Sequence, residues 1–147
     1  TEENAKDIIM SYDLVVDCFD SFESKFSLNK VCMALEKPLI HGGVTEFYGQ
    51  VISIIPGKSS CTSCIFPDKQ DRSYNVKGVI SPAVSTIGSI QVMEVVKHIV
   101  GIGTPLVDTL LCYNGLEQTF KKIAVRRNSA CPDCCEVMTR TSRIRGK

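Results

Sequence analysis

The first apolar segments of the chain predict a helix end followed by a buried strand. Residues 3–11 resemble the last turns of a helix. The continuous apolar run at 14–16 is typical of a short strand that is covered on both faces of a sheet. Two acidic residues, Asp17 and Asp20, follow this run and lie where the strand would leave the sheet.

A second helix and a second strand are predicted after the acidic residues. Apolar side chains recur at helical spacing through residues 21–37, and Pro38 stops this helix because proline cannot continue the backbone hydrogen bonding. The next apolar run, 38–44, is again typical of a strand. A strand, a helix and a strand in this order predict an α/β fold with helical crossovers.

The middle and the end of the chain add antiparallel strands to this picture. Residues 46–55 alternate loosely between apolar and polar positions and end at a Pro-Gly turn. Residues 67–78 are polar and are expected to form an exposed loop. Residues 108–127 predict a hairpin with Asn114 and Gly115 at its turn. The expected fold class is therefore α/β with a mixed sheet.

The strongest helical pattern of the chain lies between residues 81 and 101. Ser81 suits the cap of this helix, Pro82 its first position, and Gly101 its C-terminal stop. The helix carries an apolar stripe that is expected to pack mainly in the core and that includes Val84, Ile87, Ile90 and Val95.

Composition and charge exclude several classes of protein. The 147 residues suffice for one domain with a hydrophobic core, and a net charge of +1 gives no indication of a nucleic-acid partner. No apolar run is long enough to span a membrane, and no signal peptide is visible. Eight cysteines without a secretory signal indicate a reducing, cytoplasmic location. The basic segment 136–147 is expected to be a flexible tail.

Four of the cysteines form two C-x-x-C pairs, Cys61 with Cys64 and Cys131 with Cys134. Four thiolates suit a tetrahedral zinc ion, here one that would join two distant segments. A redox pair and unmetallated thiols are the alternatives; redox pairs sit at the start of a helix, and neither pair precedes a predicted helix. A four-cysteine zinc site is closed to substrate, so chemistry is expected elsewhere.

The remaining cysteines are not counted as ligands. Cys135 is a spare thiol beside the second pair. Cys18, Cys32 and Cys112 lie singly among apolar residues and are expected to act as small buried apolar side chains.

The two acidic residues after the first strand are candidates for a binding site. Ligands of open α/β sheets bind at the carboxyl ends of the strands, and Mg²⁺ favours one or two carboxylates together with phosphate oxygens. Asp17 and Asp20 therefore suit magnesium or nucleotide binding. The alternative is that both acids cap the next helix and interact with its dipole. Their spacing leaves both interpretations open.

Several motifs occur in a characteristic order along the chain. They read "YDLVVDCFDS", "PLIHGG", "GQV", "SSCTSC", "GVISPAVSTIGSIQVMEVVK" and "RRNSACPDC". Over roughly residues 8–134 this order closely resembles the ThiF/MoeB/HesA family, the bacterial and archaeal relatives of ubiquitin-activating enzymes. The resemblance implies that residues 1–135 are the C-terminal portion of a Rossmann-like adenylation domain.

The resemblance also implies an activity. Members are ATP-dependent adenylyltransferases that adenylate the C-terminal Gly-Gly carboxylate of a ubiquitin-like sulfur-carrier protein and release pyrophosphate. It implies that Asp20 is catalytic and helps to hold Mg-ATP, that Ser21 adjoins it in the nucleotide site, and that the enzyme is a homodimer. It assigns zinc to Cys61, Cys64, Cys131 and Cys134.

The sequence departs from the family pattern in three places. No glycine-rich nucleotide loop is present, so ATP binding is expected to need the missing N-terminal half or a complementary chain. Tyr74 stands where many members carry a reactive cysteine, which favours adenylation alone with sulfur from another protein. Lys25 stands where many members carry arginine; lysine keeps the charge but not the bidentate fork.

Two alternatives to an enzyme remain at this stage. The first alternative is a non-catalytic, zinc-stabilised module that docks a ubiquitin-like protein. The second is an inactive partner subunit of a chain that carries the nucleotide loop. The pathway is left open among thiamine, molybdopterin, tRNA thiolation and cysteine synthesis.

Overall fold

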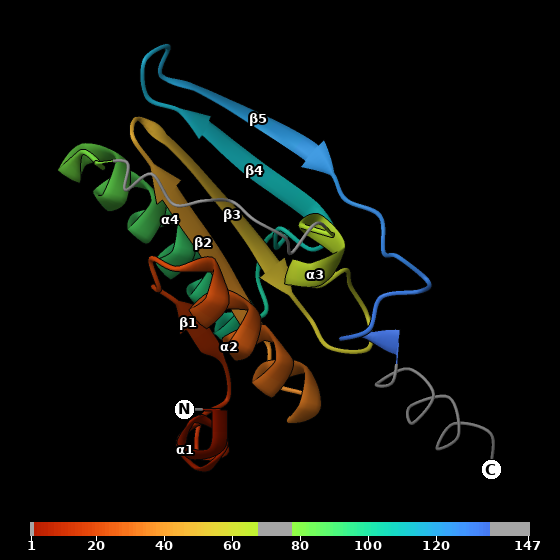
Figure 1. Cartoon of the computed structure of the whole chain (residues 1–147). Coiled ribbons are helices and arrows are strands. Elements are labelled where there is room, and N and C mark those ends of the chain that lie inside the picture. The colour runs from red at the N-terminus through yellow and green to blue at the C-terminus, as the bar shows by residue number, and fades with distance from the viewer. Residues whose placement is uncertain (1, 68–77, 136–147) are drawn as a thin grey trace.

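The computed structural model describes residues 2–67 and 78–135, which form a mixed sheet with helices on both faces (Figure 1). The loop expected at 67–78, except for its end residues, and the tail expected at 136–147 lie outside the described residues. The elements are α1 (Glu2–Ile9), β1 (Val15–Asp17), α2 (Phe22–Ala34), β2 (Leu39–Thr45), β3 (Tyr48–Ile54), α3 (Thr62–Ile65), α4 (Ser81–Val100), β4 (Thr109–Asn114) and β5 (Thr119–Ala124).

The strands follow one another across the sheet in chain order, β1-β2-β3-β4-β5. Strands β1 and β2 are parallel and are joined by α2, which confirms the predicted crossover. The pairs β2–β3, β3–β4 and β4–β5 are antiparallel. The expected α/β class with a mixed sheet is therefore confirmed.

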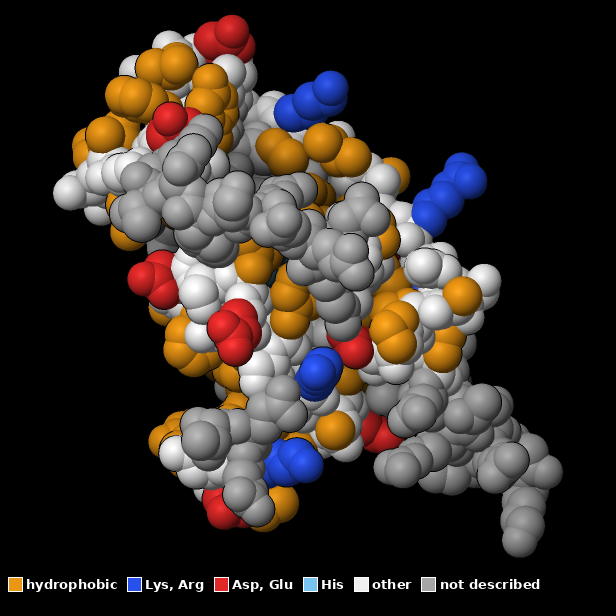
Figure 2. All heavy atoms as spheres, viewed as in Figure 1, with side chains coloured by type: hydrophobic (Ala, Val, Ile, Leu, Met, Phe, Trp, Pro, Cys, Tyr) orange, Lys and Arg blue, Asp and Glu red, His pale blue; other side chains and the backbone are white. Residues whose placement is uncertain are grey.

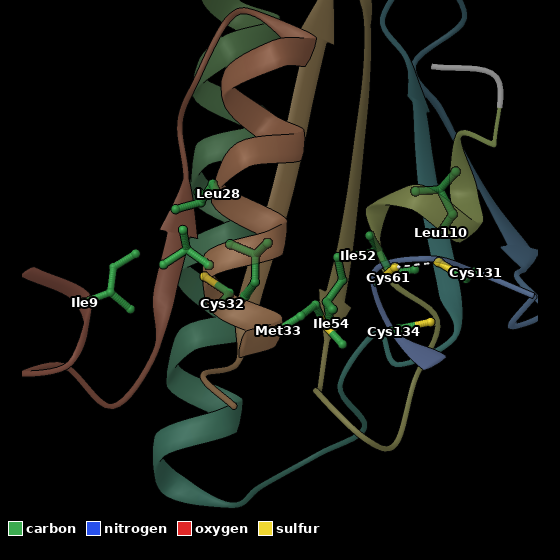
Figure 3. Close-up of a cluster of buried hydrophobic side chains, with 12 residues drawn as sticks. Ile9, Leu28, Cys32, Met33, Ile52, Ile54, Cys61, Leu110, Cys131 and Cys134 are labelled. Atoms are coloured by element: carbon green, nitrogen blue, oxygen red, sulfur yellow. Dashed lines mark hydrogen bonds between the residues drawn. The ribbon is translucent and has the colours of Figure 1, made fainter. Parts of the chain in front are cut away.

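The two faces of the sheet carry separate hydrophobic clusters. Alternate residues of a strand point to opposite faces, so neighbours such as Leu39 and Ile40 enter different clusters. One cluster packs the sheet against α2 and reaches the thiols of the C-x-x-C pairs (Figure 3). The other packs the sheet against α4, with Ile87 at its centre. Strands β2 and β3 have nearly continuous apolar runs because α2 covers one face of the sheet and α4 covers the other.

Helix α4 lies close to the sheet because glycines face it. A Cβ atom added to Gly49 of β3 would overlap the side chain of Ile87. A Cβ atom added to Gly42 of β2 would overlap the amide of Gln91. These glycines let the α4 backbone approach the strands closely, which brings polar groups of α4 within reach of the strand backbone.

The ends of α4 agree only in part with the prediction. Gly101 adopts the left-handed conformation at φ 72°, as expected of a C-terminal stop. Ser81 is not the cap, because Ile80 holds that position without a side-chain capping bond. Ser81 is the first helical residue, so Pro82 is the second and not the first. Val84 of the predicted apolar stripe is 46% exposed, whereas Ile87 is buried, and Ile90 and Val95 are partly buried.

The predicted hairpin forms, but its turn is longer than expected. Asn114 is the last residue of β4, and residues 115–118 make the turn. The Asn114 side chain accepts backbone hydrogen bonds from Leu116 at 3.1 Å and Glu117 at 3.4 Å, which stabilises this four-residue connection. Gln118 closes the turn with φ 51°.

The surface carries charges of both signs. On the face shown in Figure 2, the described acidic and basic side chains are scattered singly among apolar ones, as expected for a net charge of +1.

Among the described helices, none has the length and apolar character needed to cross a membrane.

Candidate functional site

The four side chains of the two C-x-x-C pairs meet at one point. Their Sγ atoms all lie within 4.8 Å of one another, which confirms the clustering expected from their spacing. Cys61 precedes α3 and Cys64 lies within it, and the second pair follows β5. Figure 3 shows Cys61 beside Cys131 and Cys134. The Sγ–Sγ distance is 3.9 Å for Cys61–Cys64 and 3.6 Å for both Cys61–Cys131 and Cys64–Cys134.

These distances fit a tetrahedral metal ion. Zinc–sulfur bonds of about 2.3 Å place the sulfur atoms of a tetrahedral site about 3.8 Å apart. A disulfide would need about 2.05 Å, and the structure contains all four as free thiols. Three of the four residues are buried, so an ion held there would have no open position for a substrate. The donor set therefore fits a structural zinc ion.

The helix argument against a redox pair does not hold. Helix α3 begins directly after Cys61, which is its N-cap, so the first pair does lie at the start of a short helix. Short helices of this kind have no hydrophobic periodicity and cannot be predicted from the sequence pattern. The convergence of four thiols, and not the absence of a helix, is what favours metal binding.

The surroundings move the pKa values of the thiols in different directions. Burial raises the pKa of Cys61, and burial together with neighbouring thiols raises that of Cys134 to about 12. Burial also acts on Cys64, but hydrogen bonds from the backbone amides of Cys61 and Asn128, the latter at 3.5 Å, and from the Cys134 and Cys131 thiols together lower its pKa. Such N–H donors favour the thiolate, which is the metal-binding form.

Side chains other than the four cysteines hold the two loops in place. The Arg127 guanidinium donates to the backbone carbonyl of Cys134. Asp133, inside the second pair, accepts from the hydroxyl of Ser63, inside the first. The Ser63–Asp133 contact joins the two loops directly, and the Arg127 contact fixes the second loop on itself, so both help to orient the thiols.

The other cysteines differ from the expectation in one case. Cys32 is buried as expected, and burial raises its pKa to about 12. Cys112 is half-buried. Cys18, however, is exposed in the turn that leads from β1 to α2. Cys135 points its thiol at the carbonyl of Ser129, 2.6 Å away, and lies outside the four-thiol cluster.

The second candidate site lies at the carboxyl end of β1. Asp20 is exposed in the turn between β1 and α2. Ser21 is the N-cap of α2: its Oγ accepts a hydrogen bond from the Ser24 amide at 3.1 Å. The cap of α2 is therefore Ser21, so the expectation that Asp17 and Asp20 both cap the helix is wrong. An interaction of these acids with the helix dipole stays a prediction. The Asp20 carboxylate is thus exposed to solvent directly before the N-terminus of α2.

Asp17 has a different environment from Asp20. Its side chain is buried and lies 3.1 Å from Lys25 Nζ and 2.7 Å from His41 Nδ1. Burial alone would raise the pKa of Asp17, but the contact with His41, the charge of Lys25 and the Phe19 amide together lower it. Asp17 is therefore a buried, paired carboxylate and does not face a ligand.

Sequence reasoning missed His41 and Gln91. Gln91 is buried on α4, and its Nε2 donates to the carbonyls of Asp17 at 2.9 Å and Ile40 at 3.2 Å. A polar residue within the apolar pattern of α4 was the available signal, as was a histidine within the apolar run of β2. The sequence pattern does not predict which residues His41 and Gln91 contact, because these contacts are made with other elements of the fold.

Comparisons with known proteins give a consistent result. The sequence model of the ThiF family matches residues 1–133. The chain is 37% identical to a sulfur carrier protein adenylyltransferase of Thermus thermophilus, over 91% of this chain and 53% of that protein. It is 34% identical to the sulfur carrier protein ThiS adenylyltransferase of Escherichia coli, over 91% and 54% respectively.

Solved structures show the same fold. The Escherichia coli MccB structure with AMPCPP and MccA superposes with a TM-score of 0.73 at 19% identity, over 88% of this chain and 42% of that one. The chain thus spans about half the length of the relatives it matches. With its family motifs in order and its fold shared with these proteins, the chain belongs to the ThiF family.

Proposed function

We propose that this chain is the C-terminal half of an ATP-dependent adenylyltransferase that activates the C-terminal Gly-Gly carboxylate of a ubiquitin-like sulfur-carrier protein. The observation that carries the proposal is the turn between β1 and α2, which exposes Asp20 directly before the capped N-terminus of α2 in a ThiF-family chain. Membership of the family and the names of the relatives support the reaction type.

Asp20 is proposed to hold Mg-ATP, with Ser21 adjoining the nucleotide. When bound, Mg²⁺ neutralises phosphate charge while the carrier carboxylate attacks the α-phosphorus and pyrophosphate leaves. The role proposed for this chain is to hold the metal and the phosphates in position. Asp20 supplies an oxygen ligand to the metal, and the N-terminal amides of α2 contribute positive potential beside the phosphates. Ser21 keeps the first turn of α2 formed through its bond to Ser24.

The zinc assigned to Cys61, Cys64, Cys131 and Cys134 has a structural role in this proposal. It would clamp the loop around α3 to the segment after β5. Its proposed contribution is to stability and not to the transfer of AMP.

Sulfur chemistry is proposed to occur on another protein. Tyr74, which lies outside the described residues, occupies the position of the reactive cysteine found in many family members. Adenylation needs no thiol, so this replacement leaves the first reaction intact. The nucleotide loop is proposed to come from the rest of a longer polypeptide or from a complementary chain.

A homodimer is proposed as the working assembly. The outward side of α4 exposes a group of apolar side chains, Val92, Met93, Val96, Ile99 and Val100. A subunit interface would remove them from water. Sedimentation equilibrium of the full-length protein, compared with a Met93→Lys variant, tests this: a wild-type monomer rejects the dimer.

ATP–pyrophosphate exchange by the full-length protein with candidate carriers tests the reaction. We expect carrier-dependent exchange that falls by at least about a hundredfold in Asp20→Ala. Asp7→Ala, an exposed acid of α1, is the matched control and should retain wild-type exchange. Exchange that survives Asp20→Ala rejects the catalytic role of Asp20. Carrier binding without exchange supports a non-catalytic docking module or an inactive partner subunit instead.

A further inference from the structure

Asp17 lies where three elements converge on the end of β1. The residue is 1% exposed, and its side chain is fully buried. Lys25 of α2 donates to both carboxylate oxygens at 3.1 Å, and His41 Nδ1 of β2 lies 2.7 Å from Oδ2. The Phe19 amide, in the turn that follows, donates to Oδ1 at 3.0 Å. The side chain of Asp17 thus ties the β1–α2 turn to both neighbouring elements.

The backbone of Asp17 is held as well. Gln91 of α4 donates through Nε2 to the Asp17 carbonyl at 2.9 Å and to the Ile40 carbonyl at 3.2 Å, so it bridges the parallel strands β1 and β2. Lys25 Nζ also donates to the Gly42 carbonyl at 2.6 Å. The end of β1 is therefore anchored from both faces of the sheet, by α2 on one side and by α4 on the other.

This anchoring determines where the exposed part of the turn can lie. Only Cys18, Phe19 and Asp20 separate the anchored Asp17 from Ser21, whose side chain caps α2. Asp17 itself is too buried to touch a nucleotide or a metal ion. A buried carboxylate is costly unless it is fully paired, and here each of its oxygens has a cationic or N–H partner. Its effect on ligands must therefore pass through the turn.

We propose that Asp17 is a positioning residue that holds the β1–α2 turn, and with it the Asp20 carboxylate, in the geometry that binds a metal–nucleotide complex. Lys25 and Gln91 are its main partners in this role. The inference rests on the proposed function of Asp20. It adds Asp17 and its partners as residues that affect ligand binding only through the position of Asp20. Residues behind a metal ligand commonly change metal affinity by tenfold to a hundredfold.

The first test needs no ligand. Asp17→Asn keeps the size of the side chain but removes its negative charge and one of the two oxygens that accept from Lys25, which is a donor only. Hydrogen exchange of the full-length protein, followed by mass spectrometry, should show the Phe19 amide exchanging about tenfold faster, as expected for losing a bond to a charged acceptor. Unchanged exchange at residues 18–21 overturns the proposal.

The matched control is Glu94→Gln. Glu94 is also buried and also contacts a lysine, Lys97, but its other partners are Ser53 and the Leu106 amide, away from the turn. It should lower global stability without a selective change at residues 18–21. An equal change there in both variants means that Asp17 acts only through global stability, and it rejects a positioning role.

The second test measures binding of Mn²⁺-ATP to the full-length protein by electron paramagnetic resonance. We expect Asp17→Asn to weaken binding by about tenfold. Asp20→Asn should weaken it at least as much, and adding Asp17→Asn to Asp20→Asn should cause little further loss, because Asp17 acts through Asp20. Additive losses, or no loss in Asp17→Asn, contradict the proposal.

Two further variants keep the proposal testable if Asp17→Asn does not fold. Lys25→Arg retains the cation and should stay within about twofold of wild type, whereas Lys25→Met should reproduce the loss of Mn²⁺-ATP affinity. If both variants lose affinity equally, the ion pair is not the cause. The outcomes also separate the two proposals. No effect of Asp20→Asn on Mn²⁺-ATP binding rejects the proposed role of Asp20, whereas an effect of Asp20→Asn without one of Asp17→Asn rejects only this inference.

Discussion

The side chain of Asn29 accepts a hydrogen bond from the backbone amide of Thr62 at 3.1 Å, although the two residues are 33 positions apart. Both residues are fully buried. The same Asn29 side chain donates to Asp133 at 3.4 Å, so helix α2 is bonded to both loops of the four-cysteine cluster. One asparagine thus links the helix that follows Asp20 to the proposed zinc site.

Replacing Asn29 with leucine should destabilise the protein and weaken metal binding together. The change leaves the buried Thr62 amide without its acceptor, which costs about 1–3 kcal/mol. Urea unfolding and competition with a zinc chelator measure the two effects. Lys30→Gln, an exposed change on the same helix, is the control. A stability loss with unchanged metal affinity contradicts a link between α2 and the site.

Single cysteine variants should divide into two groups by zinc content. Cys61→Ser and Cys131→Ser each remove a thiolate from the cluster, so purified variants should hold well under half of the wild-type zinc, which we expect to be close to one ion per chain. Cys135→Ser should keep the wild-type amount, because that thiol points at the Ser129 carbonyl. Metal analysis by plasma mass spectrometry checks this, and equal zinc in all variants rejects the ligand set.

Gly49→Ala should be destabilising because of close packing and not because of backbone strain. The added Cβ would overlap Ile87, which is 2% exposed and has no space to retreat. Overpacking of this kind costs about 1–3 kcal/mol. Gly49→Ala combined with Ile87→Val should recover part of the loss, whereas independent effects would simply add. Thermal or urea unfolding of the four proteins measures the coupling.

The stability supplied by Asp17 should disappear in acid. Its folded pKa lies below the unfolded value, so its stabilisation is complete above about pH 4 and is lost as the pH falls through the folded pKa. We expect Asp17→Asn to be about 3 kcal/mol less stable at pH 7 and the difference to shrink below pH 4. The groups facing it are Lys25, His41 and Cys32.

Urea titrations of both proteins from pH 3 to pH 7 give this difference directly. Protonation of the four-cysteine cluster affects wild type and variant alike, so it cancels in the subtraction. A difference that is constant over the whole range would mean that the charge of Asp17 does not stabilise the fold.

Sequence patterns were sufficient to predict helices and strands whose formation depends mainly on the residues of one segment. The helical spacing before Pro38, the glycine after α4 and the apolar run before Asp17 each predicted an element that the structure contains. The hairpin was predicted, but its turn was not, because Asn114 uses its side chain to stabilise a longer connection. Short helix α3 and the exposure of Cys18 were missed because no repeating pattern marks them.

The sequence by itself determined the order of elements, the two cysteine pairs and the family motifs, because these depend on composition and spacing along the chain. Only the tertiary structure decided that four thiols from distant loops converge, that Ser21 caps α2, and that Asp17 is buried among Lys25, His41 and Gln91. The physical reason is that burial and pairing are properties of neighbouring elements. Asp17 and Asp20 look alike in the chain, and their different roles arise from what packs around each one.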